Sequence, residues 1–322
     1  MYRTIIAPTE GSDFENAAIT LAAKLAERFE ATLYLVEVLA RPIVADSTPQ
    51  FPALEHIEQA LAEEKLARLQ RLERLGENIR SNGRVRVVTE LKEGNVTLTL
   101  SQYAKQLDAD LIVMSSHSRG GLKRLNLGSV TDFLIRNTHR PVLVVRPDTS
   151  LVSEASKATE RRIVVPLDGS PLAEQIMPEV VKFASAINAA VTVLHVLTPQ
   201  TYSQKRIMQP GLPWWDTDIE NAEAYLSWPV DYLTRHRISA TKQVILHDDV
   251  PTAILDYAIR NGADVLGIAT NGIGGLQRFV FGTVADQVTR KAPMSVLVFH
   301  PNPETAGEIA STESEVGLAT TT

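Results

Sequence analysis

The sequence predicts an α/β protein of two tandem, doubly wound domains, each a five-stranded parallel sheet of order 3-2-1-4-5 with helices on both faces. Two repeated segments indicate a duplication. Residues 4–12 read TIIAPTEGS and 162–170 read RIVVPLDGS, 158 positions later, while 120–130 (GGLKRLNLGSV) recur as 274–284 (GGLQRFVFGTV), 154 positions later. Within each half, short apolar runs alternate with helical periodicity, which is typical of parallel β-α-β units with right-handed crossovers.

The elements of the first half follow from apolar patterning. Nearly continuous apolar runs such as 31–39 are typical of parallel strands that are buried on both faces. Apolar residues at helical spacing predict helices, and the broad stripe of the longest one is expected to pack on the core. The predicted strands are 2–7, 31–39, 84–91, 110–114 and 141–146, and the predicted helices lie at 17–25, 55–79, 98–107 and 129–137.

The second half repeats this order. Its predicted strands are 162–166, 190–197, 240–246, 264–268 and 295–300, and its predicted helices are 172–184, 220–234, 252–261 and 283–290. A proline-rich stretch at 198–216 is predicted to be irregular and contains Trp214 and Trp215. These tryptophans cover a pocket, meet a partner or form a local hydrophobic plug, and the sequence does not separate the three.

The repeats also set the expected domain boundaries. The first domain is predicted at 1–147 and the second at 161–302, joined by a polar linker at 148–160. Residues 303–322 have no periodicity and few large apolar side chains, so we expect a disordered tail.

Composition narrows the function classes. The 322 residues carry a net charge of −6, which argues against a nucleic-acid-binding face. No cysteine is present, so disulfides, thiol catalysis and cysteine-ligated metals are excluded, and the seven histidines show no metal-binding spacing. No apolar run reaches the ~18 residues of a membrane span, and the chain enters a strand pattern at once without a leader. We therefore expect a cytoplasmic protein with no metal site.

The candidate ligand site lies where strand order reverses, beyond the carboxyl ends of the parallel strands. The loop after the first strand, the end of the second strand and the glycine-rich segment after the fourth strand meet there in each half. That segment leads into a helix at Gly128-Ser129 or Gly282-Thr283, and a helix N-terminus with nearby glycines can bind phosphate. Ser129 and Thr283 are expected to be N-caps. Glycine spacing alone fits a phosphate site and a ligand-free turn equally.

These motifs together resemble the universal stress protein family in its tandem, two-domain form, over 1–147 and 161–302. The resemblance rests on both repeats, on Asp264 before the fourth strand and on the closing strands at 141–146 and 295–300. It implies a stress-response or regulatory protein that binds an adenine nucleotide, ATP with or without Mg²⁺. It also implies that the two fifth strands pair across a pseudo-two-fold axis inside one chain, so that the tandem chain mimics a dimer of single domains. The further association of two chains into a homodimer is a separate, open prediction.

The resemblance assigns a nucleotide site to each half. ATP-binding members of the family resemble the pattern glycine, two residues, glycine, nine residues, glycine, then serine or threonine. The second-half positions are Asp168, Val196, Ile268, Ala269, Asn271, Gly272, Gly282, Thr283 and Val284. The first-half positions are Glu10, Val38, Met114, Ser115, His117, Ser118, Gly128, Ser129 and Val130.

The two sites are not equal. The first half has Ser118 where the second has Gly272, and its acidic residue after the first strand is Glu10 instead of Asp168. A serine side chain takes space that a phosphate needs, and the longer glutamate disturbs a close carboxylate contact. We therefore expect the second half to bind the nucleotide and the first-half site to be weakened.

Catalysis is not expected. Neither half offers a general base, a nucleophile or a pair of close carboxylates, and the chain has no P-loop motif. His117 contacts phosphate or is a plain surface residue, and Asp110 and Asp264 are expected to serve as turn or cap residues. Two alternatives stay open: a structural or interaction protein without nucleotide, and a slow ATP hydrolase.

Overall fold

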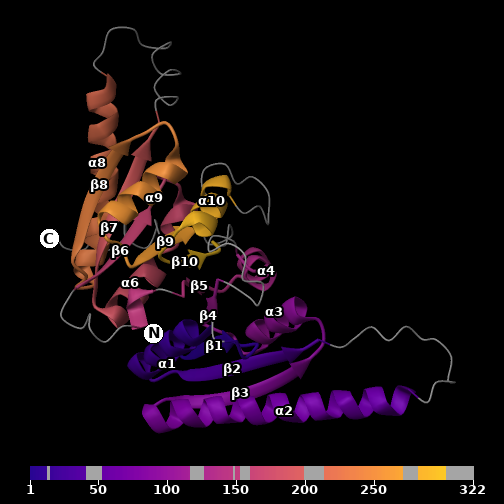
Figure 1. The fold of residues 1–322 in the computed structure, drawn as a ribbon. Helices are drawn as coiled ribbons and strands as arrows, with labels where there is room; N and C mark the ends of the chain where they lie inside the picture. The colour runs from indigo at the N-terminus through magenta and orange to yellow at the C-terminus, as the bar shows by residue number, and fades with distance from the viewer. Residues whose placement is uncertain are drawn as a thin grey trace.

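The computed structural model describes residues 1–12, 15–40, 53–116, 127–147, 149–152, 160–198, 214–270 and 282–301. Its strands form a single ten-stranded sheet in the order β3-β2-β1-β4-β5-β10-β9-β6-β7-β8 (Figure 1). The strands are β1 Thr4–Pro8, β2 Thr32–Leu39, β3 Arg86–Glu93, β4 Leu111–Ser115, β5 Val142–Val145, β6 Arg161–Pro166, β7 Ala189–Leu197, β8 Ala240–Leu246, β9 Val265–Ala269 and β10 Ser295–Phe299.

Each half of this sheet has the predicted order 3-2-1-4-5, with parallel neighbours throughout. In the first half β1 lies between β2 and β4, and in the second half β6 lies between β7 and β9. The fold class predicted from the sequence is confirmed in both halves. Strand order reverses beside β1 and beside β6, so these two points are the candidate ligand positions.

The halves meet through their fifth strands. β5 and β10 pair antiparallel, with Val142 opposite Val298 and Val144 opposite Val296. These side chains are almost fully buried. The predicted intrachain pairing is confirmed, and it removes two edges that would otherwise be open to other chains.

Helices cover both faces of the sheet, as predicted. Apolar residues from α1, α2, α6 and α8 share one core layer with alternate strand residues, and those from α3, α4, α9 and α10 share the other. Figure 1 shows α2 beside β3 and α8 beside β8 at the outer edges. The helices are α1 Asn16–Phe29, α2 Ala53–Asn82, α3 Val96–Gln106, α4 Ser129–Asn137, α5 Pro171–Glu174, α6 Met177–Ile187, α8 Trp214–Arg235, α9 Val250–Arg260 and α10 Thr283–Lys291.

Several helix boundaries differ from the sequence prediction. α8 begins at Trp214, inside the stretch that we expected to be irregular. The helix predicted at 172–184 is divided into α5 and α6, and Pro178 in the first turn of α6 explains the break because proline has no N–H to donate. α3 and α9 begin two residues early, where Asn95 and Asp249 cap the backbone N–H groups of Leu98 and Thr252.

Two aspartates fasten the amino ends of the central strands. Asp110 Oδ2 accepts hydrogen bonds from the backbone N–H groups of Arg3 and Thr4, at 2.7 and 2.9 Å. Asp264 Oδ2 accepts one from Arg162 at 2.9 Å. Both are structural, as expected, and they lie at the opposite end of the sheet from the candidate sites.

The expected linker is partly described. A short 3₁₀ helix, η2, covers Ser150–Val152, and Leu151 is buried in the core layer that also contains the apolar residues of α1. Lys24 Nζ of α1 donates to Val152 O at 2.9 Å. The linker is therefore not polar throughout, because Leu151 is packed into the core. The remainder of 148–160 and the tail at 303–322 lie almost wholly outside the described residues.

Candidate functional site

The glycine-rich loop of the second half is closed at its base by backbone hydrogen bonds. Thr270 N donates to Phe299 O at 2.8 Å, and Gly282 N donates to Thr270 O at 2.7 Å. A Cβ added at Gly282 would lie 2.9 Å from Thr270 O, so this close approach requires glycine. The two ends of the loop, Thr270 and Gly282, therefore lie side by side at the carboxyl end of β9. Asn271 and Gly272 belong to 271–281, which lie outside the described residues.

Helix α10 starts directly at this closure. Gly282 is its N-cap, with φ −59° and ψ 143°, and Thr283 is the first helical residue. Our prediction of Thr283 and Ser129 as N-caps is therefore wrong, because Gly282 and Gly128 hold that position. At Gly282 the close approach to Thr270 O leaves no room for a side chain. The first N–H groups of a helix have no partner within it, so α10 presents donors and its positive dipole end at the switch point.

The first half builds the same closure. Ser116 N donates to Val145 O at 3.1 Å, and Gly128 N donates to Ser116 O at 3.0 Å. Thr131 of α4 adds a buried hydrogen bond from its Oγ1 to Ser115 O at 3.1 Å. His117 and Ser118 fall outside the described residues. The scaffold for a helix-N-terminal site therefore exists twice.

The loop after β6 is held by its own side chains. Asp168 Oδ1 accepts hydrogen bonds from Ser170 N at 3.0 Å and from Ser170 Oγ at 2.6 Å. Ser170 Oγ in turn accepts from Ala173 N and caps α5. Gly169 supplies the positive φ of +85° that this turn requires. Asp168 is exposed at the carboxyl end of β6.

An aromatic cluster that we did not predict lies behind this loop. His195 of β7 donates from Nδ1 to Leu167 O at 2.7 Å, and its ring meets Tyr225 of α8 edge-on at 5.8 Å. Burial, and then the neighbouring Glu174 carboxylate, raises the pKa of the Tyr225 hydroxyl well above its usual range. Burial also raises the pKa of Glu174. The sequence did not indicate the contacts of Tyr225, because it lies within the apolar periodicity of 220–234 and an aromatic residue at such a position is expected only to pack in the core.

The loop after β1 is held differently. Glu15 at the start of α1 is 7% exposed, and its carboxylate accepts hydrogen bonds from Thr9 Oγ1, Glu10 N and Gly11 N, at 2.7, 2.8 and 3.2 Å. Burial raises the pKa of this carboxyl, while these hydrogen bonds oppose the rise. Glu15 therefore fixes the loop from beneath.

Arg71 of α2 covers the same loop. Its Nη2 donates to Glu10 O at 3.3 Å and to Glu37 Oε1 at 2.6 Å. A Cβ added at Gly11, where φ is +77°, would lie 2.3 Å from Arg71 Cζ. Glu37 is 1% exposed and also accepts from Arg68 Nη1 at 2.7 Å. An ionic cluster thus occupies the place that His195 and Tyr225 hold in the second half.

The other candidate positions lie at strand ends or in a first helical turn. These are Val38 near the end of β2, Val196 near the end of β7, Met114 and Ser115 at the end of β4, Ile268 and Ala269 at the end of β9, and Val130 and Val284 as the second residues of α4 and α10.

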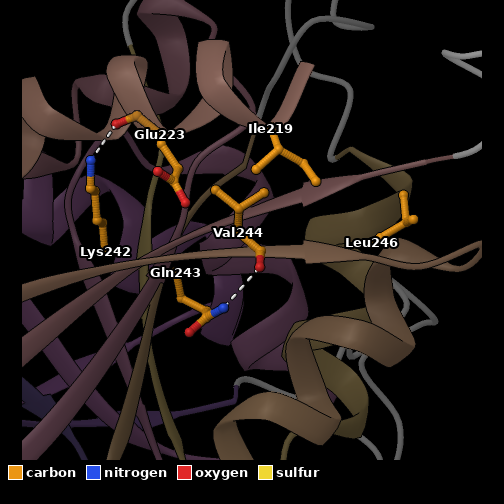
Figure 2. Close-up of a pocket in the computed structure, with 6 residues that line it drawn as sticks. All are labelled: Ile219, Glu223, Lys242, Gln243, Val244 and Leu246. Atoms are coloured by element: carbon orange, nitrogen blue, oxygen red, sulfur yellow. Dashed lines mark hydrogen bonds between the residues drawn. The ribbon is translucent and has the colours of Figure 1, made fainter. Parts of the chain in front are cut away.

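A pocket of about 340 Å³ lies elsewhere, between α8 and the edge strand β8 (Figure 2). Ile219, Val244 and Leu246 supply its apolar lining. Lys242 Nζ donates to Glu223 O at 2.8 Å, which joins the strand to the helix across the pocket. None of the predicted site residues lines this pocket.

The described residues offer neither a membrane span nor a metal site. No helix there is long and apolar enough to cross a membrane. Among the described residues, no group of three or more histidine, aspartate or glutamate side chains is arranged to hold a metal ion.

The fold and these loops define a class: a tandem α/β protein in which each half places a helix N-terminus at the switch point of its sheet. The sequence matches the universal stress protein family over residues 1–146 and 160–300, and the chain belongs to that family.

Known proteins agree with this placement. A universal stress protein of Mycolicibacterium smegmatis is 24% identical over 308 residues, which cover 92% of this chain and 97% of that protein. One of Methanocaldococcus jannaschii is 35% identical over 147 residues, 45% of this chain and 83% of that protein. The solved structure of a putative universal stress protein from Pseudomonas aeruginosa has a TM-score of 0.63 at 18% identity and covers 96% of this chain and 98% of that one, which shows the shared fold. Other universal stress protein structures, of TM-scores 0.33 and 0.32 to this chain, were solved in complex with cAMP and with dAMP.

Proposed function

We propose that the second half binds an adenine nucleotide, ATP with or without Mg²⁺, and that the chain is a stress-response regulator without efficient catalysis. The observation that supports this most is the closure of Thr270 on Gly282, which presents the N-terminus of α10 at the switch point. Backbone N–H groups at such a terminus bind phosphate oxygens. The proposed ligand-binding residues are Asp168, Val196, Ile268, Ala269, Asn271, Gly272, Gly282, Thr283 and Val284.

The first-half site is proposed to be weak. Besides Glu10 and Ser118, the contact of Arg71 with Glu10 O adds an independent reason, because it ties the loop to α2. The positions concerned are Glu10, Val38, Met114, Ser115, His117, Ser118, Gly128, Ser129 and Val130. This half therefore serves mainly as the structural partner of the second half through β5.

The proposal extends to the organisation of the protein. We propose domains at 1–147 and 161–302, a cytoplasmic location and a homodimer of the 35.3 kDa chain. A monomeric mass in light scattering would contradict the dimer. A slow hydrolase remains the alternative activity, and it requires phosphate release that depends on Gly272.

Thermal unfolding with and without Mg·ATP tests nucleotide binding. A ligand at ~100 times its Kd stabilises the folded state by about 2.7 kcal/mol, which raises Tm by a few degrees. Gly272→Val should abolish the rise, because it replaces the glycine that the family's phosphate-loop pattern requires, while the matched variant Ser118→Val should keep it. No rise in the parent protein at millimolar Mg·ATP would refute the proposal, and loss in Ser118→Val alone would reverse the ranking of the halves.

A further inference from the structure

Strand β8 is the outer edge of the second half, and its outer side has no strand beside it among the described residues. It pairs with β7, and His247 N, directly after the strand, donates to Leu197 O of β7 at 3.0 Å. Because backbone groups alternate in direction along a strand, those of Lys242, Val244 and Leu246 point away from β7. The edge therefore offers backbone donors and acceptors to a further strand.

The two edges of the ten-stranded sheet differ in protection. β3, the edge of the first half, has charged side chains at four of its eight positions, and Lys92 and Glu90 are paired at 2.9 Å. β8 has one charged residue in seven, Lys242, and its Nζ is bound to Glu223 O of α8. Leu246, at the end of β8, is 53% exposed. Charged side chains prevent edge strands from pairing with other chains, so β8 is the edge that is open to pairing.

The pocket between α8 and β8 lies along this edge (Figure 2). Val244 and Leu246 line it from the strand, and Ile219 lines it from the helix. Since alternate residues of a strand share one face, a strand that pairs with β8 adds its own side chains to this lining. The outward carbonyl of Val244 accepts a hydrogen bond from Gln243 Nε2 at 2.8 Å, so a side chain of the same strand takes the place of a partner strand.

The charges at the two ends of β8 identify the strand that fits. Arg235 and Arg237 come just before the strand, Asp248 and Asp249 come just after it, and all four are exposed. Seven residues at ~3.3 Å each keep these two ends about 23 Å apart. A second copy of the chain, related by a two-fold axis, places its β8 antiparallel to the first, so the basic end of each strand lies beside the acidic end of the other. A parallel arrangement would put like charges together.

The chain already contains one pairing of this kind. β5 and β10 join antiparallel, and Val144 lies opposite Val296 where the two halves meet. That junction keeps the helix layers of both halves on the same two faces of the sheet. Antiparallel pairing of two β8 strands would extend the sheet in the same way, with α8 of both copies on one face.

We propose that two copies of this chain associate through antiparallel pairing of their β8 strands. The two ten-stranded sheets then become one continuous sheet, Arg237 of one protomer lies near Asp248 of its partner, and the exposed Leu246 of each protomer is covered. Each contact occurs twice, because the interface is symmetric. This inference rests on the homodimer proposed above and names its surface.

Sedimentation equilibrium of the full chain, which measures the dissociation constant of the dimer, tests the proposal. The parent protein should reach twice the 35.3 kDa mass of one chain. Arg237→Glu and Asp248→Arg should each weaken the dimer by at least about tenfold, because both symmetric contacts become repulsive. The double variant Arg237→Glu/Asp248→Arg restores opposite charges and should recover most of the lost affinity. Leu246→Lys should also weaken the dimer, since lysine on an edge strand opposes pairing.

The matched control is Arg84→Glu, the same charge reversal at an exposed position just before the other edge strand, β3, and it should keep the parent's dissociation constant. A dimer that Arg237→Glu and Leu246→Lys leave unchanged would overturn the inference while the homodimer stands. A double variant as weak as the single ones would also overturn it. A parent that is monomeric at every concentration would refute the homodimer itself. If Arg237→Glu does not fold, Arg235→Glu serves instead with the same expected loss.

Discussion

The loops after β1 and β6 occupy equivalent places in the two halves, yet they are fixed by different chemistry. In the first half a buried carboxylate, Glu15, and a guanidinium, Arg71, hold the loop from both sides. In the second half Asp168 and Ser170 hold it with two hydrogen bonds from one serine. Duplication preserved the strand and the turn, while the surroundings of the turn diverged.

The side chains on the neighbouring strands, β2 and β7, differ in the same way. Glu37 lies 27 positions after Glu10, and His195 lies 27 positions after Asp168. Glu37 is neutralised by arginines 68 and 71, whereas His195 packs on Tyr225. One half is tied by ion pairs to its outer helix, and the other is held by an aromatic contact. A fold can therefore keep two copies of a site scaffold while different side chains fix each copy.

The largest expected effect comes from the loop closures, which the halves share. Gly282→Val should lower the affinity for Mg·ATP by more than about tenfold, a loss above 1.4 kcal/mol, because a side chain there meets Thr270 O. Calorimetry measures the affinity. Gly128→Val makes the same change in the first half and should leave the affinity intact. Equal losses in both variants would mean that the halves are functionally alike.

The second expected effect concerns the stability of the diverged layer. Glu37→Gln should lower the free energy of unfolding by about 1–3 kcal/mol, because charged hydrogen bonds to two arginines are lost while those arginines keep contact with water. His195→Gln keeps a polar side chain that can donate to Leu167 O and should cost about 1 kcal/mol or less. Urea denaturation compares the two. A larger loss for His195→Gln would contradict the expectation that the ionic cluster stabilises its loop more than the aromatic contact does.

The smallest expected effect lies where the halves are symmetric. Arg136 Nη2 pairs with Asp286 at 2.6 Å, and Arg290 pairs with Asp132 across the pseudo-two-fold axis. The side chains are about one-third exposed, so Arg136→Ala and Arg290→Ala should each cost about 0.5–1 kcal/mol. Unfolding in 1 M NaCl should remove most of the difference, since the Debye length there is ~3 Å. Clearly unequal losses would show that the asymmetry extends to this interface.

Much of the fold could be predicted because its determinants are local. Apolar runs such as 31–39 and helical periodicity such as that of 55–79 are properties of neighbouring residues, and they gave the order of strands and helices. Boundaries were less predictable. Asn95 and Asp249 are good N-cap residues that we did not recognise, and Pro178 broke a helix that periodicity alone extended.

The candidate site was predictable only in part. Its strand ends and helix starts follow from the repeat, so Asp168, Gly282 and Ala269 lie on the expected elements. The N-cap of α10 was misassigned because Gly282 packs against the carbonyl oxygen of Thr270, a residue twelve positions earlier, and this contact leaves no room for a side chain. The preference for serine and threonine at the N-cap depends on the local helix end and does not take account of a tertiary contact such as this one.

The sequence by itself determined the duplication, the α/β class and the family, because repeats and hydrophobic periods are written along the chain. Only the tertiary structure decided which side chains surround each loop. Arg71 reaches Glu10 across 61 positions, and His300 meets Thr270 and His139 across 30 and 161 positions. Such contacts depend on crossover connections that bring distant segments to one end of the sheet, and no local pattern records them.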